Sequence, residues 1–540
     1  MTALMRPKTP TAPLWLLGLL LAAGAQAQQG APLPPMVAPA KPAFTIRGFE
    51  LQGEDPLPGG ESTRVLAPFL RTDATLETLQ QATAALEAAL QARGFALHRV
   101  VLPPQTVGET VKLQIVRFAL DKVTVEGLKT GAYDEANIRA SLPELQEGGS
   151  PNLKTLSVQT TIANESQGKQ VQVSLKEAAT PDRIDARVVV SEAKPWNFAL
   201  GLANTGSQAT GRDRLTVSGG HANVFGRDHE FVGAFTTSID KGLDDVRQYG
   251  ANYRIPLYAQ GGVLGLGYTR STVVGDFGAL TSTGAGQTMG INYSHYLPPE
   301  GGYRSYVTLG WEDKRFDVTK IAGQPIPGQL TRRSRPLTLG YTARVSGDEA
   351  VWGYGASVSV NTGGGGGNDL GAYRSEDARI TTRNFKVLRG QANYLGLLGT
   401  GGWQWSARTS VQWSPDALIS GEQFGLGGAS TVRGTDERPI SGDSGVLAVL
   451  EVSTPMLLPG LRLHGFVDAG WLRNHDPNGN PKPARDQLAS VGLGLRYAAQ
   501  ALTLSAEWGR IVTGSELAAF NPAAPRHGDV KFHINATWRF

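Results

Sequence analysis

The pattern of apolar and polar residues divides the chain into two parts that meet near residue 195. From Trp196 onward, apolar and polar residues alternate in segments of about ten residues, which are rich in glycine and aromatic side chains. Successive side chains of a strand point to opposite faces, so each segment predicts a strand with one apolar face. Sixteen such segments begin near residues 196, 213, 228, 245, 262, 285, 303, 334, 350, 384, 402, 445, 460, 488, 500 and 529. The pattern predicts a mainly β protein in which residues 195–540 form a sixteen-stranded antiparallel transmembrane barrel.

The connections between these segments alternate in length. Connections after even-numbered segments are short, as at 225–227 and 347–349, whereas those after odd-numbered segments are long, as at 362–383 and 414–444. Outer-membrane barrels combine short periplasmic turns with longer extracellular loops. The alternation therefore places the preceding half of the chain in the periplasm, and it argues against a water-soluble β-sandwich.

The first half of the chain, residues 44–194, alternates strand-like and helix-like patterns. Leucines at three- and four-residue spacing over 76–90 predict an amphipathic helix that ends at Gly94. The same plan returns more loosely afterwards, which predicts two small α+β modules, residues 44–118 and 119–194. The expected strands are 44–51, 97–102, 110–116, 120–125, 171–175 and 184–190, and further helices are expected over 133–142 and 152–164.

The first 27 residues are typical of a secretory signal peptide. A basic start precedes an apolar stretch at 14–23 and a small-residue cleavage site at Ala25–Ala27. Residues 28–43 hold five prolines, which predict a stiff, extended linker. Sixteen extended residues cover at most about 56 Å, so we expect no helix from this segment to plug the barrel.

Composition excludes several classes of function. Mean hydropathy is −0.19, and after residue 23 no run approaches the ~20 apolar residues that a membrane-spanning helix needs. The chain has no cysteine, which excludes disulfides and thiolate metal sites, and its net charge of +4 gives no reason to expect a nucleic-acid partner. The histidines show no metal-ligand spacing, and Gly442–Gly445 resembles a serine-protease nucleophile stretch without matching partners. We therefore expect no catalytic residue, metal or cofactor, and no enzyme.

A motif in the first module carries a more specific resemblance. Gly94 and Phe95 end the predicted helix, and Pro103, Pro104 and Gln105 form a turn between two predicted strands. This arrangement resembles the polypeptide-transport-associated (POTRA) module of two-partner secretion transporters. The resemblance implies that the two α+β modules are POTRA modules.

The long connection 414–444 carries a second motif. Val432, Arg433 and Gly434 resemble the Val-Arg-Gly signature of the Omp85 superfamily, in which the sixth extracellular loop folds back into the barrel. The connection joins the eleventh and twelfth predicted strands, as that loop does in the superfamily. Thr435 follows where the signature usually has an aromatic residue, so the packing of the loop tip is open at this point.

A third motif lies on the thirteenth predicted strand. Phe466, Asp468 and Gly470 match the Phe-x-Asp-x-Gly motif of the same superfamily, whose aspartate pairs with the loop arginine. The resemblance implies a charge-assisted pair between Arg433 and Asp468 that holds the loop in the lumen.

The two ends of the barrel segment complete the resemblance. Asn204, Gly206, Ser207 and Gly211 resemble the opening hairpin of two-partner secretion barrels. At the other end, apolar residues including Trp538 alternate with polar ones up to Phe540, and an aromatic final residue resembles the signal that barrel-assembly machinery recognises. This implies contacts with that machinery and with periplasmic chaperones during biogenesis, and with outer-membrane lipids afterwards.

These motifs identify the chain as a member of the two-partner secretion outer-membrane transporters (TpsB, the ShlB/FhaC/HecB type) within the Omp85 superfamily. Membership implies export of a large partner exoprotein, whose N-terminal secretion domain the periplasmic POTRA modules capture. One alternative is an assembly factor of the same superfamily, in which more POTRA modules are expected. Another is a diffusion porin, which lacks both barrel motifs, and a third is a surface enzyme or adhesin, for which no passenger segment is present.

Overall fold

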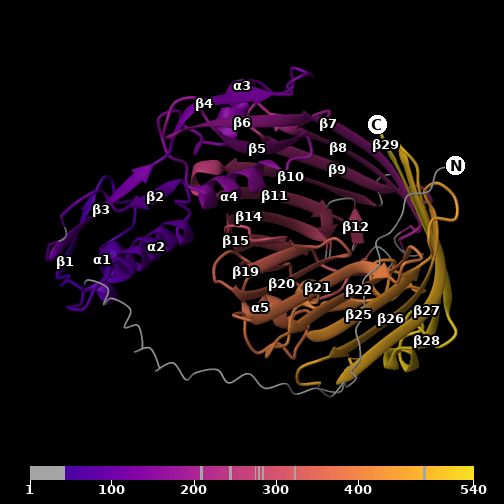
Figure 1. The fold of residues 1–540 in the computed structure, drawn as a ribbon. Coiled ribbons are helices and arrows are strands. Elements are labelled where there is room, and N and C mark those ends of the chain that lie inside the picture. Colours follow the sequence, from indigo (N-terminus) through magenta and orange to yellow (C-terminus); the bar gives the residue numbers. More distant parts are fainter. Residues whose placement is uncertain are drawn as a thin grey trace, which may run out of the picture.

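The protein consists of a wide barrel with two small modules at one end (Figure 1). The computed structural model describes residues 43–106, 108–206, 211–241, 246–273, 275–277, 280–282, 285–321, 324–477 and 482–540. The expected signal peptide, the expected linker up to residue 42 and Ser207 lie outside these ranges. Among the residues described, no helix is long and apolar enough to cross a membrane.

The first module packs its helices on a three-stranded sheet of order β1–β3–β2, with β1 parallel to β3 and β2 antiparallel to it. Leu79, Leu86 and Leu90 of the amphipathic helix are buried in its core. The expected strand at 44–51 begins only at Gly48, because the backbone of Phe44 bonds to Ala74 instead. The elements are β1 (Gly48–Gln52), α1 (Glu61–Leu66), η1 (Ala67–Phe69), α2 (Leu76–Ala92), β2 (His98–Val101) and β3 (Thr110–Arg117).

The second module repeats this plan with the sheet order β4–β6–β5. Its β5 and β6 form the expected antiparallel hairpin, and β4 runs parallel to β6. Leu120, Ile138 and Val188 belong to its buried core. The elements are β4 (Ala119–Glu126), α3 (Glu135–Ser141), α4 (Leu153–Ala163), β5 (Lys169–Glu177) and β6 (Arg183–Glu192).

The barrel is closed and antiparallel, and its sixteen strands confirm the predicted fold class. β18 and β19 both pair with β15 and follow one another as a single strand. Each predicted segment begins within three residues of an observed strand. The strands are β7 (Trp196–Ala203), β8 (Arg214–Val224), β9 (His229–Ser238), β10 (Arg247–Leu257), β11 (Gly262–Ser271), β14 (Gly286–Tyr296), β15 (Tyr303–Phe316), β18 (Arg332–Ser334), β19 (Pro336–Ser346), β20 (Ala350–Asn361), β21 (Lys386–Leu398), β22 (Trp403–Trp413), β25 (Ser444–Ser453), β26 (Leu461–Arg473), β27 (Arg485–Ala498), β28 (Leu502–Thr513) and β29 (Val530–Arg539).

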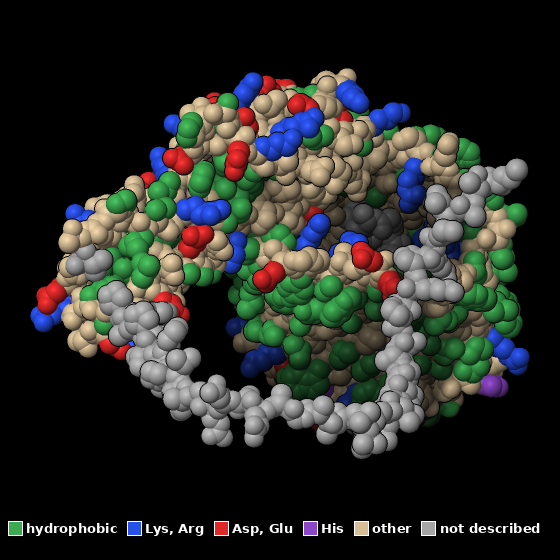
Figure 2. All heavy atoms as spheres, in the orientation of Figure 1, with side chains coloured by type: hydrophobic (Ala, Val, Ile, Leu, Met, Phe, Trp, Pro, Cys, Tyr) green, Lys and Arg blue, Asp and Glu red, His purple; other side chains and the backbone are tan. Residues whose placement is uncertain are grey.

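The barrel wall has an apolar outer face and a polar inner face. On β26, Leu463 and Val467 are exposed on the outside, whereas the alternate residues His464 and Asp468 are buried inside. Hydrophobic side chains gather on the wall in Figure 2, and charged ones gather on the two modules. An outward apolar band is what a barrel in lipid requires.

The connections between the barrel strands, mainly the long ones, carry short elements of their own, which alternation along the chain did not predict. The connection 362–385 holds a helix whose Tyr373 is buried against Phe385 and Ile419. These short elements are η2 (Tyr258–Gln260), β12 (Gly275–Phe277), β13 (Leu280–Ser282), β16 (Lys320–Ile321), β17 (Gln324–Pro325), α5 (Leu370–Arg374), η3 (Ser420–Glu422), β23 (Phe424–Leu426), β24 (Ile440–Gly442) and η4 (Glu516–Ala519). Apart from η2, and from η3, β23 and β24 in the connection that folds into the barrel, they lie at the end of the barrel away from the modules, where they form a folded cap.

Candidate functional site

The connection between β22 and β25, residues 414–443, folds into the barrel, and we call it the lumenal loop. Its hairpin of β23 and β24 leads to a tip at residues 427–439. In the tip, Val432 is fully buried in a cluster with Leu447 and Ile511 of the barrel wall. The tip therefore lies against the inner face of the barrel.

Arg433 binds Asp468 of β26 through its backbone and its side chain. Its Nε lies 2.9 Å from Asp468 Oδ2, its Nη2 lies 2.7 Å from Oδ1, and its backbone nitrogen donates to Oδ2 at 3.0 Å. Ser490 of β27 donates to the same carboxylate at 3.3 Å. Asp468 is 0% exposed, and a buried carboxylate needs a positively charged partner. The bidentate contact with the Arg433 guanidinium provides that partner.

Further charges surround this pair. The Nη1 of Arg433 lies 3.6 Å from Glu451 and 3.4 Å from Glu507, and Arg496 contacts the same two carboxylates at 2.7 and 3.4 Å. The cluster thus holds three carboxylates and two guanidinium groups, so the loop arginine carries half of its permanent positive charge.

Part of this cluster has the donor types of a metal site. The ligand atoms of Glu451, His464 and Glu507 lie within 4.8 Å of one another, and imidazole with carboxylates is a donor set that zinc uses. However, the guanidinium groups of Arg433 and Arg496 contact both carboxylates and would repel a cation. We therefore attribute the cluster to charge pairing.

The motif glycines allow a close approach between the loop and the wall. Gly434 has a φ of 101°, and a side chain at Gly509 of β28 would meet its backbone nitrogen at 2.7 Å. A side chain at Gly470 would meet Leu426 of the loop at 2.5 Å. The ring of Phe466 lies 3.4 Å from the Arg433 guanidinium, which is a cation–π contact. Each motif residue of β26 therefore touches the loop.

Replacing Gly509 with alanine is expected to dislodge the loop tip while the barrel still assembles. The new methyl group would overlap the backbone of Arg433 and Gly434, which has no flexible end that could move aside. Planar-bilayer recordings should show channel openings at least ten times more often than in the parent. The matched control is Gly340→Ala on β19, where the nearest atom lies at an ordinary 3.6 Å. Unchanged recordings from Gly509→Ala would contradict the close approach.

Thr435 occupies the position that is usually aromatic in the signature, and it stabilises the tip from within. Its hydroxyl accepts from the backbone nitrogen of Gly428 at 3.0 Å and donates to the carbonyl of Asp436 at 2.9 Å. The residue is buried. A hydrogen-bonded hydroxyl thus takes the place of ring packing.

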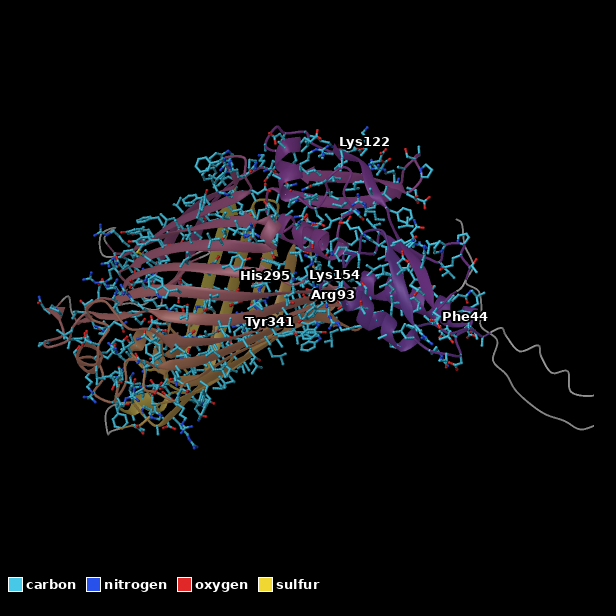
Figure 3. All side chains as sticks on the ribbon, turned by 90° about the vertical axis from the view of Figure 1, so that its left-hand side faces the viewer. Phe44, Arg93, Lys122, Lys154, His295 and Tyr341 are labelled. Atoms are coloured by element: carbon cyan, nitrogen blue, oxygen red, sulfur yellow. The ribbon has the colours of Figure 1, made fainter. Side chains whose placement is uncertain are left out.

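The motif of the first module lies where the two modules meet. Gly94 has a φ of 94°, a side chain there would meet Asn152 at 2.1 Å, and its carbonyl accepts from Leu153 at the start of α4. Lys154 donates to the carbonyl of Ala92 at 2.6 Å and lies beside Arg93 in Figure 3. Phe95 packs on the core of the first module. The motif glycine thus permits the contact between the modules.

After the proline turn of the same motif, a side chain pairs with β3 where the strand backbone of β2 no longer does. Pro103 and Pro104 follow β2 and have no N–H to donate to β3. The side chain of Gln105 instead donates to the carbonyl and accepts from the N–H of Lys112, each at 2.8 Å. An amide side chain therefore completes the edge of β3.

A buried ion pair joins the second module to the barrel, and no motif in the sequence pointed to its lysine. Lys169 of β5 lies 2.6 Å from Asp228 in the turn between β8 and β9 and also donates to Asn137 at 3.0 Å. Tyr258 donates to Asp228 at 2.7 Å, and Asn137 donates to the carbonyl of Gly226 at 2.8 Å. Both members of the ion pair are buried, and burial lowers the pKa of Lys169 while the carboxylate opposes that shift.

Apolar contacts enlarge the contact between the second module and the barrel, which we call the joint. Val158 and Ile162 of α4 pack on Val263 and Tyr296 at the periplasmic ends of β11 and β14. Figure 3 shows both modules at this end of the barrel, with Phe44 far from it. The second module is therefore fixed beside the barrel mouth, and the first module extends away from it.

A closed barrel with an arginine-bearing loop in its lumen and POTRA modules at its periplasmic end defines an outer-membrane protein transporter. The chain belongs to the family of haemolysin secretion/activation proteins ShlB/FhaC/HecB, whose family model matches residues 183–497. A model of the ShlB-type POTRA domain matches residues 44–117. The chain is thus an outer-membrane transporter of two-partner secretion, from a family of transporters rather than enzymes, and its partner is a secreted exoprotein.

Individual relatives agree with this assignment. The chain is 26% identical over 450 residues to the outer membrane transporter CdiB of Escherichia coli, covering 80% of this chain and 73% of that protein. It is 25% identical over 458 residues to CdiB of Dickeya dadantii, covering 80% and 77%. The solved structure of CdiB from Escherichia coli has the same fold, with a TM-score of 0.71 at 20% identity over 95% of this chain and 94% of that one. CdiB from Acinetobacter baumannii gives a TM-score of 0.69 at 19% identity, with the same coverage.

Proposed function

We propose that the two POTRA modules capture the N-terminal secretion domain of the exoprotein while it is unfolded, and that the barrel conducts it once the lumenal loop has moved. The observation that carries this proposal is the two-pronged contact of Arg433 with buried Asp468, which gives the loop one defined resting position. Val432 and Gly434 seat the tip, and Phe466 and Gly470 form its receiving surface. We assign these residues to holding the loop.

Capture takes place by strand addition to the module sheets. An edge strand presents unpaired backbone groups to which an extended chain can pair. β5 forms one edge of the second sheet and is nine residues long. Its Val171 is already covered, because Asn164 donates to its carbonyl at 2.9 Å and accepts from its nitrogen at 2.6 Å. The remaining edge, residues 173–177, is where we place the exoprotein.

The chain is divided accordingly in our proposal. Residues 1–27 are a cleaved signal peptide, 28–43 a linker, 44–118 and 119–194 the POTRA modules, and 195–540 the barrel. The observed elements support these limits, because β3 ends at Arg117 and β7 begins at Trp196.

The last strand supports a role in biogenesis. Trp538 and Phe540 are 48% and 71% exposed on the outer face of the barrel. Aromatic rings in this position are accessible to the barrel-assembly machinery before the strand reaches lipid. We therefore propose that machinery and periplasmic chaperones as partners during assembly.

Deleting residues 44–118 is expected to stop secretion while leaving a heat-modifiable barrel in the outer membrane. The second module keeps its ion pair and apolar contacts with the barrel, so the deletion removes a capture surface without disturbing the pore. Exoprotein in the culture medium and gel mobility with and without boiling give the two readouts. Full export by the deleted chain would contradict the capture role.

A further inference from the structure

The barrel closes where β29 meets β7, and we call this junction the closing seam. The two strands pair over five residue pairs, from Asn535 with Ala203 to Arg539 with Ala199. On their other sides, β29 pairs with β28 over nine and β7 pairs with β8 over eight. Residues 530–534 of β29 therefore extend beyond the end of β7.

A side chain continues the hydrogen bonding past that end. Asn204 follows β7 directly, and its backbone nitrogen donates to the carbonyl of Ile534 at 3.2 Å. Its side-chain Nδ2 donates to the carbonyl of Phe532 at 2.6 Å, and its Oδ1 accepts from the nitrogen of Ile534 at 2.8 Å. One amide group thus supplies the donor and the acceptor that a further residue of β7 would have supplied.

The lumenal loop covers the same stretch of β29 from the inside. Lys531 donates to Asp436 of the loop tip at 2.6 Å and to the carbonyl of Gly206 at 3.2 Å. The backbone nitrogen of Gly434 donates to Nε2 of His533 at 3.1 Å. Lys531 therefore connects the last strand, the first hairpin and the loop that transport must displace.

The outer side of this stretch is hollow. A cavity of about 550 Å³ opens there, with Leu202, Asn204, Ile239 and Ile534 in its lining. Leu202 and Ile534 belong to the lipid-facing rows of their strands and are 46% and 40% exposed. Asn204 thus lines a cavity that has both lipid-facing apolar residues and the charged residues Asp213, Arg214 and Asp240 in its lining.

We propose that Asn204 is the residue that keeps the closing seam shut while the exoprotein is in the pore. At rest, the loop tip shares this task through Lys531 and Asp436. When the loop leaves its position on Asp468, that contact is lost, and the Asn204 amide, together with the bond from Lys531 to the carbonyl of Gly206, holds the distal half of the seam. The inference rests on the proposed movement of the loop, and it gives the opening hairpin motif a physical role.

The first test measures closure of the purified full-length chain in detergent, without exoprotein. Asn204→Ala and Asn204→Asp should both lower the temperature at which the heat-modifiable band is lost, by on the order of a few degrees or more. The aspartate cannot donate to the carbonyl of Phe532, so it should not restore closure. The control is Asn393→Ala in the middle of the ladder formed by β20, β21 and β22, which should leave the temperature unchanged. A normal temperature for both Asn204 variants would overturn the proposal.

A disulfide across the seam tests whether Asn204→Ala destabilises the closing seam itself or the barrel in general. Leu202 and Ala536 are direct cross-strand partners next to Asn204, and the chain has no other cysteine to interfere. In an Asn204→Ala chain, the pair Leu202→Cys and Ala536→Cys should restore the transition temperature when oxidised and not when reduced. If Asn204→Ala fails to assemble alone, assembly of the oxidised triple variant supports the proposal. No rescue in either case overturns it.

The contribution of the lumenal loop to closure of the seam is measured in the same assay. Asp436→Asn should lower the transition temperature by itself, and adding Asn204→Ala should lower it by at least the sum of the two shifts. An unchanged temperature for Asp436→Asn would remove the loop from the seam. Because this assay contains no exoprotein, its outcome is independent of whether loop variants alter secretion.

Discussion

An Arg433→Ala chain is expected to assemble a heat-modifiable barrel but to secrete the exoprotein at less than a tenth of the parent rate. Removing one member of a buried ion pair costs about 3–5 kcal/mol, because the other charge stays buried without a partner. Asp468 is fully buried, and Glu451 and Glu507 would each lose one of the two guanidinium groups that contact them. The tip would leave the wall and occupy the lumen in many positions. Planar-bilayer openings should therefore become irregular and more frequent.

Arg496→Ala is the matched control for this prediction. Arg496 contacts the same glutamates, but its side chain is 47% exposed, and among the described residues its ion pairs are with Glu451 and Glu507 and not with Asp468. Secretion by this variant should stay close to the parent. Arg433→Lys should lie between the two, since an ammonium keeps the charge but loses the paired hydrogen bonds of a guanidinium. Native secretion by Arg433→Ala would refute the holding role of the arginine.

Asp228→Asn should release the second POTRA module from the barrel and strongly reduce secretion. Asparagine tolerates the positive φ of 58° at this position, so the substitution removes the charge without straining the turn. Lys169 would then be buried with neutral partners, and such a loss costs about 3–5 kcal/mol. Spin labels at exposed positions 122 and 348, one on the module and one on the barrel, should give a narrow distance distribution in the parent and a broad one in the variant.

The same variant should show a pH dependence with a defined sign. Burial lowers the pKa of Lys169, and without Asp228 the opposing effect is absent. A buried lysine whose pKa is depressed favours the docked state when it is neutral, so docking should recover as the pH rises and weaken as it falls. Adding Lys169→Met should restore the narrow distribution at all pH values. A broad distribution in the double variant at all pH values would show that the unpaired charge of Lys169 is not what releases the module.

Alternation along the chain was enough to predict the barrel, because every strand divides lipid from a polar lumen. The strands of the modules were also predictable, although β1 lost its first residues when Phe44 paired with Ala74. The cap elements were not predictable, since α5 depends on burial of Tyr373 against segments more distant in the chain. The positions of apolar and polar residues in these elements depend on packing against neighbouring loops and not on the membrane.

The candidate site divides in the same way. Arg433 and Asp468 could be named from their motifs, and the structure brings them together. Gly509 could not, because one glycine on an alternating strand carries no sign that a loop backbone lies against it. The role of Lys169 could not be predicted either, since a lysine in a strand usually faces water. Only the fold places it against Asp228. Contacts between remote segments need either a motif or a structure to reveal them.

At three places in this protein the amide of a side chain pairs with the backbone of a strand in place of a further strand residue, at Gln105, Asn164 and Asn204. Such an amide differs from a paired strand in how fast it can release its hydrogen bonds. A strand leaves a ladder through collective motions of microseconds or longer, whereas partly exposed side chains such as these change rotamer much faster. Each amide can therefore step aside and return many times before the backbone around it has moved. At the edge of β5, an exoprotein segment paired with residues 173–177 can therefore extend toward Val171 by replacing the Asn164 amide, without unfolding any strand.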